Sequence, residues 1–395
     1  MPTCTDMPGT CPFRLVNLSV RHFCAQINLL FEDMGKTKIC SGLCLAIISF
    51  CTWFLSFASG AELPDTFLLN RAQNKQGEYK YKEGEDFQTW RHKTRSALIE
   101  KLGISKKLSA TRVPLEPRIL WSREVENGMI FKISLKSEAD YDLPIYLCVP
   151  KGEGPFPVWI CLQGHGTGMH ASISVQWQDE TTFKSDNGDR DFAIQCLAKG
   201  YAALCVEQRA LGEKSCMDDR KYGCRRLALH NLMFGETLIG NRVFDVDRAI
   251  DFIYTKECLR NDRIGIIGNS GGGTTAIYSG AILDRLTHVM PSSCFSTYKD
   301  SILAKNHCPC NYFPDMLNWG DMGDLAGLCA PKYLVIVNGV QDTIFPIEPA
   351  KAEFERCKVI YKAAGYPERC RMVIGNAGHR FYKDDAWPVM DPFFK

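Results

Sequence analysis

Three residues in the second half of the chain have the types and the order that acyl transfer requires. Ser270 lies in the run Gly268-Asn269-Ser270-Gly271-Gly272, and Asp342 and His379 follow it along the chain. A serine hydroxyl is a weak nucleophile at neutral pH, so it needs a general base that is itself oriented by a carboxylate. Ser270, Asp342 and His379 are therefore the predicted nucleophile, acid and base of a hydrolase that forms an acyl-enzyme.

The surroundings of Ser270 favour a nucleophile over other uses of a glycine-rich turn. The motif Gly-x-Ser-x-Gly follows the apolar strand-like run "RIGIIG" and precedes a plausible helix, which is the context of a nucleophile elbow. So sharp a turn requires residues without a Cβ two positions away from the serine, and Gly268 and Gly272 supply them. The alternative is a phosphate-binding loop, but "GNSGGG" lacks the lysine of a P-loop.

The predicted partners of Ser270 each follow a later strand. "KYLVIVNG" ends shortly before Asp342, and "CRMVIG" ends shortly before His379. The order serine, acid, histidine is that of α/β-hydrolases. The competing acids Asp321 and Asp324 lie before the strand that precedes Asp342.

Acyl transfer at such a serine also needs two backbone N–H groups that hold the developing oxyanion. One is the amide of Gly271, which follows the nucleophile. The other is expected in the loop "LQGHGTG" after an early strand, where Gln163-Gly164 takes the place of the usual His-Gly and makes the His165 amide the candidate donor. The His165 side chain has the alternatives of lining the pocket or binding a metal ion.

Neither a metal ion nor a cofactor is predicted. His307, Cys308 and Cys310 lie close together, but His-Cys-x-Cys is not a standard zinc spacing and no matching pair is evident. A formal net charge of +2 and the lack of a basic run give no support to a nucleic-acid partner.

The elements that position these residues follow a rhythm typical of an α/β protein. Residues 62–115 are polar with a helical stretch in which Phe87, Trp90, Leu98 and Leu102 share a face. From residue 116 the sequence predicts antiparallel strands around an Asn127-Gly128 turn, and then alternating strands and helices. Alternation with buried apolar strands predicts a mostly parallel sheet that is covered by helices on both faces. We therefore expect an N-terminal helical extension over 62–115 and one catalytic domain over 116–395.

The N-terminal part, residues 1–61, predicts export. The uncharged apolar run 41–58 follows Lys36 and Lys38 and precedes small residues, the pattern of a secretory signal over 34–61. The run is nearly long enough to span a bilayer, so an uncleaved anchor is the alternative to cleavage after Gly60 or Ala61.

The chain contains 19 cysteines, six of them before residue 61. Cys148, Cys161 and Cys205 lie in apolar strand-like runs and are expected to behave as small buried hydrophobic residues. Cys308 and Cys310 lie in a loop-like stretch and could form disulfides, although spacing does not determine pairing.

Several long runs resemble a bacterial α/β-hydrolase group that is related to dienelactone hydrolases and acetylxylan esterases. They are "LQGHGTGMH", "DRDFAIQCLAKGYAALCVEQRALGE", "GNSGGG", "NHCPCNYFPDMLNWGDMGDLAGLCAPK" and "GHRFYKDDAWPVM", within residues 85–395. The resemblance implies the same nucleophile, acid and base. It also suggests that Glu207 and Arg209 face the site, with a structural ion pair as the alternative. The serine nucleophile departs from the cysteine of true dienelactone hydrolases, and Gln163 departs from the expected histidine.

Three functions are compatible with these residues. The first is hydrolysis of a carboxylic ester, with an acetylated polysaccharide such as xylan as the substrate suggested by the resemblance. The second is a serine peptidase similar to prolyl oligopeptidases, but the chain leaves no room for their propeller domain. The third is a catalytically inactive binding protein, which the presence of all three catalytic residue types disfavours.

Overall fold

The computed structural model describes residues 63–215 and 223–394. The predicted leader, residues 1–61 with its apolar run 41–58, lies outside the described residues. In the described ranges, no helix is both long enough and apolar enough to cross a membrane. Residues from Phe67 onward form one compact unit, and this unit carries all the predicted site residues.

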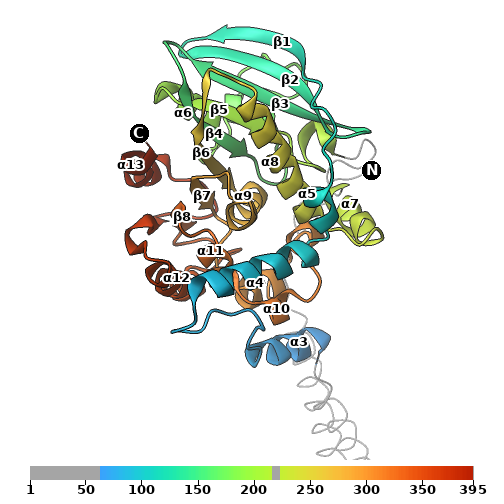
Figure 1. Ribbon diagram of the computed structural model, residues 1–395, viewed down its shortest axis with the longest axis vertical. Helices are drawn as coiled ribbons and strands as arrows, with labels where there is room; N and C mark the ends of the chain where they lie inside the picture. The colour runs from blue at the N-terminus through green and yellow to red at the C-terminus, as the bar shows by residue number, and fades with distance from the viewer. Residues whose placement is uncertain (1–62, 216–222, 395) are drawn as a thin grey trace, which may run out of the picture. The chain divides into compact units, whose positions relative to one another are not determined.

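One nine-stranded sheet organises this unit, with the strand order β1-β2-β3-β5-β4-β6-β7-β8-β9 (Figure 1). Strands β1 to β3 pair antiparallel with one another and β3 pairs antiparallel with β5, whereas the strands from β5 to β9 run parallel. The predicted mostly parallel α/β sheet is confirmed. The strand bounds are β1 (Arg118–Val125), β2 (Gly128–Glu138), β3 (Tyr141–Pro150), β4 (Phe156–Leu162), β5 (Ala202–Val206), β6 (Leu259–Asn269), β7 (His288–Ser292), β8 (Tyr333–Gly339) and β9 (Cys370–Gly375).

Helices cover both faces of the sheet, as predicted. On one face, α8, α9, α11 and α12 share a core with α4, and on the other face α6 and α13 form a second core. The α-helices of the described chain are α3 (Pro64–Gln73), α4 (Phe87–Lys101), α5 (Ser105–Ser109), α6 (Phe192–Ala198), α7 (Gly223–Leu232), α8 (Leu238–Tyr254), α9 (Gly271–Ile282), α10 (Met316–Trp319), α11 (Met322–Gly327), α12 (Ile347–Ala363) and α13 (Lys383–Phe394).

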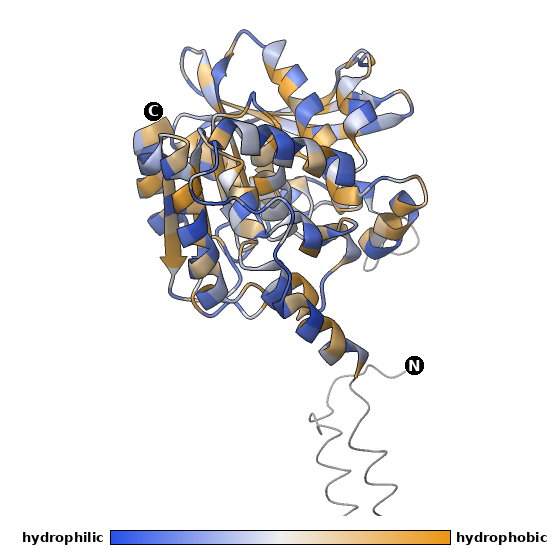
Figure 2. Ribbon diagram, turned by 60° about the horizontal axis from the view of Figure 1, so that its bottom comes forward, coloured by the Kyte–Doolittle hydropathy of each residue, from blue (hydrophilic) through white to orange (hydrophobic). Residues whose placement is uncertain are grey.

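Strand β4 shows how the sequence divides its side chains between the two cores. Val158, Ile160 and Leu162 belong to the first core, whereas Trp159 and Cys161 belong to the second. This alternation follows from the two-residue period of a strand. Both faces are apolar because helices cover both of them, and Figure 2 shows many of those helices as ribbons that change between blue and orange along their length.

The first hairpin forms where it was predicted, but its turn lies one residue earlier. Val125 pairs with Gly128, so the two turn residues are Glu126 and Asn127 rather than Asn127 and Gly128. Gly128 instead begins β2, where an added Cβ would lie 2.1 Å from the Val149 carbonyl oxygen. The glycine is required by the close approach of strand β3, not by the turn.

The helical segment before the sheet packs into the first core. Phe87, Trp90 and Leu98 of α4, with Leu102 just after it, are buried, which confirms the predicted apolar face. Asp86 caps this helix by accepting a hydrogen bond from the Thr89 amide. Within the described residues, the segment from 67 to 115 therefore belongs to the same compact unit as the sheet.

His288 fixes the C-terminal helix to the beginning of strand β7. Its Nε2 donates to the Phe393 carbonyl of α13 at 2.8 Å, and its ring stacks on Tyr333 at 4.8 Å between centroids. Burial, together with the nearby Arg263 and Arg369, lowers the pKa of His288 to about 4, although the hydrogen bond to the Phe393 carbonyl acts in the opposite direction. The buried imidazole is therefore neutral at neutral pH.

This pKa predicts a loss of stability in acid. The unfolded chain binds a proton near the ordinary pKa of 6.5, but folded His288 does so only near 4, so its contribution is complete above 6.5 and is lost as the pH falls toward 4. We expect the free energy of unfolding to fall by about 2 kcal/mol more in the wild type than in His288→Gln between about pH 7.5 and pH 5. Urea titrations at both pH values test this, and equal losses in the two proteins would contradict it.

Candidate active site

Ser270 occupies a strained turn between β6 and α9. Its backbone angles are φ 56° and ψ −123°, a region that side-chain-bearing residues rarely adopt. An added Cβ at Gly268 would lie 2.4 Å from the Gly272 carbonyl carbon, and one at Gly272 would lie 2.2 Å from the Leu162 carbonyl oxygen. Both glycines are thus required for the tight approach of helix α9 and strand β4 to this turn. Such a turn places the serine at the end of the strand, where a nucleophile is accessible.

His379 and Asp342 are hydrogen-bonded to each other. His379 Nδ1 lies 2.8 Å from Asp342 Oδ2, and the Asp342 side chain is fully buried. The other carboxylate oxygen, Oδ1, accepts from the amides of Ile344 at 2.9 Å and Phe345 at 3.1 Å. These bonds fix the carboxylate in the loop after β8, and the carboxylate in turn fixes the orientation of the imidazole. His379 also stacks on the Phe345 ring at 6.1 Å between centroids.

Strand β7 connects the loop that carries His379 to the nucleophile turn. The Ser270 amide donates to the Ser292 carbonyl at 2.8 Å, and the Ser293 hydroxyl donates to the Arg380 carbonyl at 3.0 Å. His379 precedes Arg380, so both loops are held at the same end of β7. Among the hydrogen bonds of the described residues, none joins Ser270 Oγ to His379. In ligand-free enzymes such bonds are often long and tighten when substrate binds.

A cavity of about 220 Å³ lies at the nucleophile, lined by Ser270, Gly271, His165, Ile344, Phe345 and residues of the segment 306–311. The loop after β4 passes directly against the nucleophile, because an added Cβ at Gly164 would lie 2.9 Å from Ser270 Cβ. The His165 amide nitrogen lies 3.8 Å from the Cβ position of Gly271. The two amides predicted to hold an oxyanion are therefore neighbours beside Ser270.

Gln163, where the resemblance led us to expect histidine, holds this loop in place. Its Nε2 donates to Ser172 Oγ and to the Arg190 carbonyl, each at 2.7 Å. Its own carbonyl accepts a hydrogen bond from Gln208 Nε2. The side chain is 2% exposed, so Gln163 supports the loop from inside the protein.

Glu207 does not reach the cavity at Ser270. It is 1% exposed and accepts hydrogen bonds from the amides of Met169 at 3.2 Å and Glu213 at 3.1 Å. Burial raises the pKa of Glu207 to about 8. The side chain thus joins two loops behind the site.

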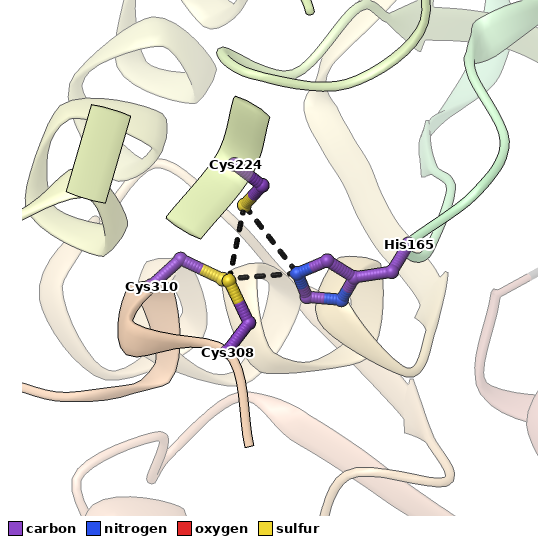
Figure 3. Close-up of side chains that lie close together, drawn as sticks. All are labelled: His165, Cys224, Cys308 and Cys310. Carbon is purple, nitrogen blue, oxygen red and sulfur yellow. Dashed lines mark hydrogen bonds between the residues drawn. The ribbon is translucent and has the colours of Figure 1, made fainter. Parts of the chain in front are cut away.

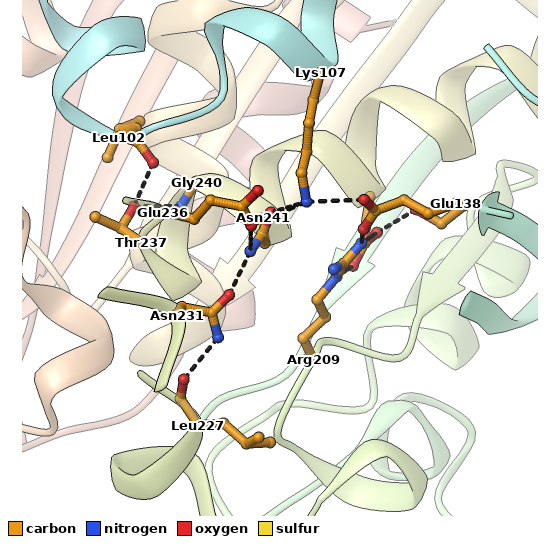
Figure 4. A network of polar contacts seen from close by, with 12 residues as sticks. Leu102, Lys107, Glu138, Arg209, Leu227, Asn231, Glu236, Thr237, Gly240 and Asn241 are labelled. Carbon is orange, nitrogen blue, oxygen red and sulfur yellow. Dashed lines mark hydrogen bonds and ion pairs between the residues drawn. The ribbon is translucent and has the colours of Figure 1, made fainter. Parts of the chain in front are cut away.

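Arg209 is likewise held in a structural network rather than at the nucleophile (Figure 4). Its guanidinium forms ion pairs with Asp245 at 2.7 Å and Glu138 at 2.6 Å. Lys107 links the same Glu138 to Asn241 of α8, which continues to Asn231 of α7. The suggestion that Glu207 and Arg209 face the site is therefore not supported, and they do not pair with each other.

The two acids that compete with Asp342 in the sequence, Asp321 and Asp324, have structural roles. Asp321 caps α11 and accepts from the Tyr298 amide at 2.8 Å. Asp324 is fully buried and pairs with Arg356 at 2.8 Å. Neither contacts His379 among the described hydrogen bonds.

The expectation that Cys308 and Cys310 lack metal-binding partners is wrong. His165 and Cys224 are brought beside them, and the ligand atoms of all four residues lie within 4.8 Å of one another. His307 is not part of this group. Cys148, Cys161 and Cys205 are buried as expected, and the cysteines of the described ranges are all free thiols.

In sequence, the chain is similar to a protein of Bacillus subtilis. No family model matches the chain. The protein named "Putative hydrolase YtaP" from Bacillus subtilis (strain 168) is 24% identical over 274 residues, which is 68% of this chain and 88% of that protein.

Two solved structures share the architecture. One, described as "a putative acetyl xylan esterase" from Bacteroides fragilis NCTC 9343, gives a TM-score of 0.64 with 15% identity over 83% of this chain and 85% of that one. A glucuronoyl esterase from Solibacter usitatus gives a TM-score of 0.59 with 16% identity over 81% and 96%. The chain has the α/β-hydrolase fold, and the predicted resemblance to acetylxylan esterases is confirmed at the level of fold.

Proposed function

We propose that the protein is a serine hydrolase that cleaves carboxylic esters through an acyl-enzyme. The observation that carries this proposal is the His379–Asp342 hydrogen bond held at the same end of β7 as the strained Ser270 turn. His379 takes the Ser270 proton, and Ser270 Oγ attacks the ester carbonyl. The amides of Gly271 and His165 hold the oxyanion, and His379 then protonates the departing alcohol. Water activated by His379 releases the acid and restores Ser270.

The surroundings of Ser270 support ester chemistry without further groups. His379 is a quarter exposed, so its outer nitrogen can exchange protons with substrate and water. Asp342 is buried and stays a hydrogen-bond acceptor to Nδ1, which directs the lone pair of Nε2 outward. The oxyanion donors are backbone amides fixed by the turn and by Gln163, and preorganised donors of this kind usually contribute more to acyl-transfer catalysis than any other single effect.

We further propose a carbohydrate ester as the substrate. A second cavity, of about 320 Å³, adjoins the first because His165 lines both. Its lining includes Trp177, Lys184, Asp186 and His170, an aromatic ring with polar groups that suit a sugar. Burial lowers the pKa of His170 to about 4, so the imidazole that lines this cavity is neutral at neutral pH. The esterases named above as structural relatives are consistent with this class.

Substrate choice distinguishes an esterase from a peptidase. We expect the wild type to hydrolyse p-nitrophenyl acetate and to release acetate from acetylated xylan, and to leave a peptide p-nitroanilide intact, because the described residues include no propeller domain. Release of p-nitroaniline without ester turnover would favour the peptidase. No turnover of any of the three substrates, together with no fluorophosphonate labelling, would favour an inactive binding protein.

We also propose that the chain is exported, with residues 34–61 as the signal and 116–395 as the catalytic region that follows the helical segment. The support is the apolar run 41–58 with its flanking lysines and small residues. N-terminal sequencing of the mature protein tests it. A start near Ala61 supports cleavage, and an intact Met1 contradicts it.

A further inference from the structure

One histidine and three cysteines from three separate segments converge beside the proposed active site. Figure 3 shows Cys224 from helix α7, Cys308 and Cys310 from the loop that leads through Pro309–Asn311, and His165 from the loop after β4. His165 Nε2 lies 3.1 Å from Cys310 Sγ and 3.4 Å from Cys224 Sγ, and Cys308 Sγ lies 3.5 Å from Cys224 Sγ. The four ligand atoms therefore enclose a space of the size of one ion.

These separations match a tetrahedral zinc site. Zinc–sulfur bonds of about 2.3 Å and zinc–nitrogen bonds of about 2.0–2.1 Å place neighbouring ligand atoms about 3.5–3.8 Å apart. A disulfide would require a sulfur–sulfur distance of about 2.05 Å. Cys₃His is one of the ligand sets that structural zinc uses. The three separations given above need to lengthen by only a few tenths of an ångström to match such a site.

The charges around the cluster also suit three thiolates and a divalent cation. Arg242 is 2% exposed and donates from Nη2 to Cys224 Sγ at 3.3 Å and to the Arg209 carbonyl at 2.8 Å. The ion pairs of the described chain include no carboxylate partner for Arg242. Three thiolates with Zn²⁺ carry a net charge of −1, which the Arg242 guanidinium balances.

We propose that His165, Cys224, Cys308 and Cys310 bind one Zn²⁺ as a structural site. With four protein ligands the ion has no open position for water or substrate, so it takes no part in the hydrolysis. It joins the loop that carries the His165 amide to the loop over residues 308–310 and to α7. Cys308 and His165 also line the cavity at Ser270, so the zinc ion would fix one wall of that cavity and one oxyanion donor. The metal site does not depend on the proposed esterase activity.

Metal analysis of the purified full chain tests this site. We expect one zinc per chain that survives gel filtration and is released by a strong chelator. Cys224→Ser and Cys308→Ser should weaken zinc binding by more than about 100-fold, since each removes a ligand. Cys258→Ser, at an exposed free cysteine, is the matched control and should keep one zinc per chain.

A second measurement covers the case in which the cysteine variants do not fold. The wild type, stripped of metal under reducing conditions and given one equivalent of Co²⁺, should develop the thiolate-to-cobalt absorption of a tetrahedral site. Peptide mapping of the untreated wild type should find Cys224, Cys308 and Cys310 protected from alkylation until the chelator is added. A disulfide among these three cysteines, or free reactive thiols with neither metal bound, would overturn the proposal.

Discussion

Replacing Ser270 with alanine is expected to lower kcat for p-nitrophenyl acetate by about 10⁶-fold. The substitution removes the only atom that forms the acyl bond, and the turn itself persists because alanine carries the same Cβ. The amides of Gly271 and His165 remain, so the residual rate should still exceed that in water by about 10³–10⁴-fold. Initial rates of the purified variant, compared with the wild type at saturating ester, measure the loss.

Ser109→Ala is the matched control for Ser270→Ala. The Ser109 hydroxyl donates only within its own helix, to the carbonyls of Ser105 and Lys106, so its removal should leave kcat unchanged. If Ser270→Ala kept more than a tenth of the wild-type rate while both variants were folded, Ser270 could not be the nucleophile.

Replacing Asp342 with asparagine should lower kcat by about 10⁴-fold, the size of loss that the same change causes in other Ser-His-Asp enzymes. The asparagine oxygen can still accept from the Ile344 and Phe345 amides, as Oδ1 does now, so the loop should keep its shape. The amide NH₂ then faces His379 and cannot accept from Nδ1–H. The imidazole is held in the wrong tautomer, with a proton on the nitrogen that must act as the base.

Asp321→Asn separates this effect from a general loss of stability. Asp321 caps α11 and contacts the Tyr298 amide, so its replacement should reduce the free energy of unfolding and leave kcat of the folded protein near that of the wild type. Urea unfolding and initial rates measured on both variants make the comparison. A larger fall in kcat for Asp321→Asn than for Asp342→Asn would contradict the assignment of the acid.

The sequence predicts this nucleophile turn well because its cause is local. Gly268 and Gly272 are needed by contacts within two residues of Ser270 and by the adjacent strand, so the motif and its flanking strand and helix carry the information. Asp342 and His379 are separated from Ser270 along the chain, but the order of parallel strands brings their loops to the same end of the sheet. The strand topology therefore brings the three residues to one end of the sheet although they are far apart in the sequence.

The features that the sequence did not predict depend on contacts between distant segments. His165, Cys224 and the pair Cys308 and Cys310 come from three places, and no fixed spacing connects them. The available signal was the His-Cys-x-Cys run, in which His307 is the wrong histidine. Likewise, the partners of Arg209 are Asp245 of α8 and Glu138 of β2, which lie far from it in the sequence.

A covalent adduct on Ser270 tests the central proposal most directly. The full chain is treated with a fluorophosphonate, with and without prior incubation with an acetate ester, and the intact mass and the modified peptide are determined by mass spectrometry. We predict one adduct per chain, on the peptide that contains Ser270, which forms more slowly in Asp342→Asn and in the presence of the ester and is absent from Ser270→Ala. An adduct on another residue, or none on a protein that still hydrolyses the ester, would contradict the proposed mechanism.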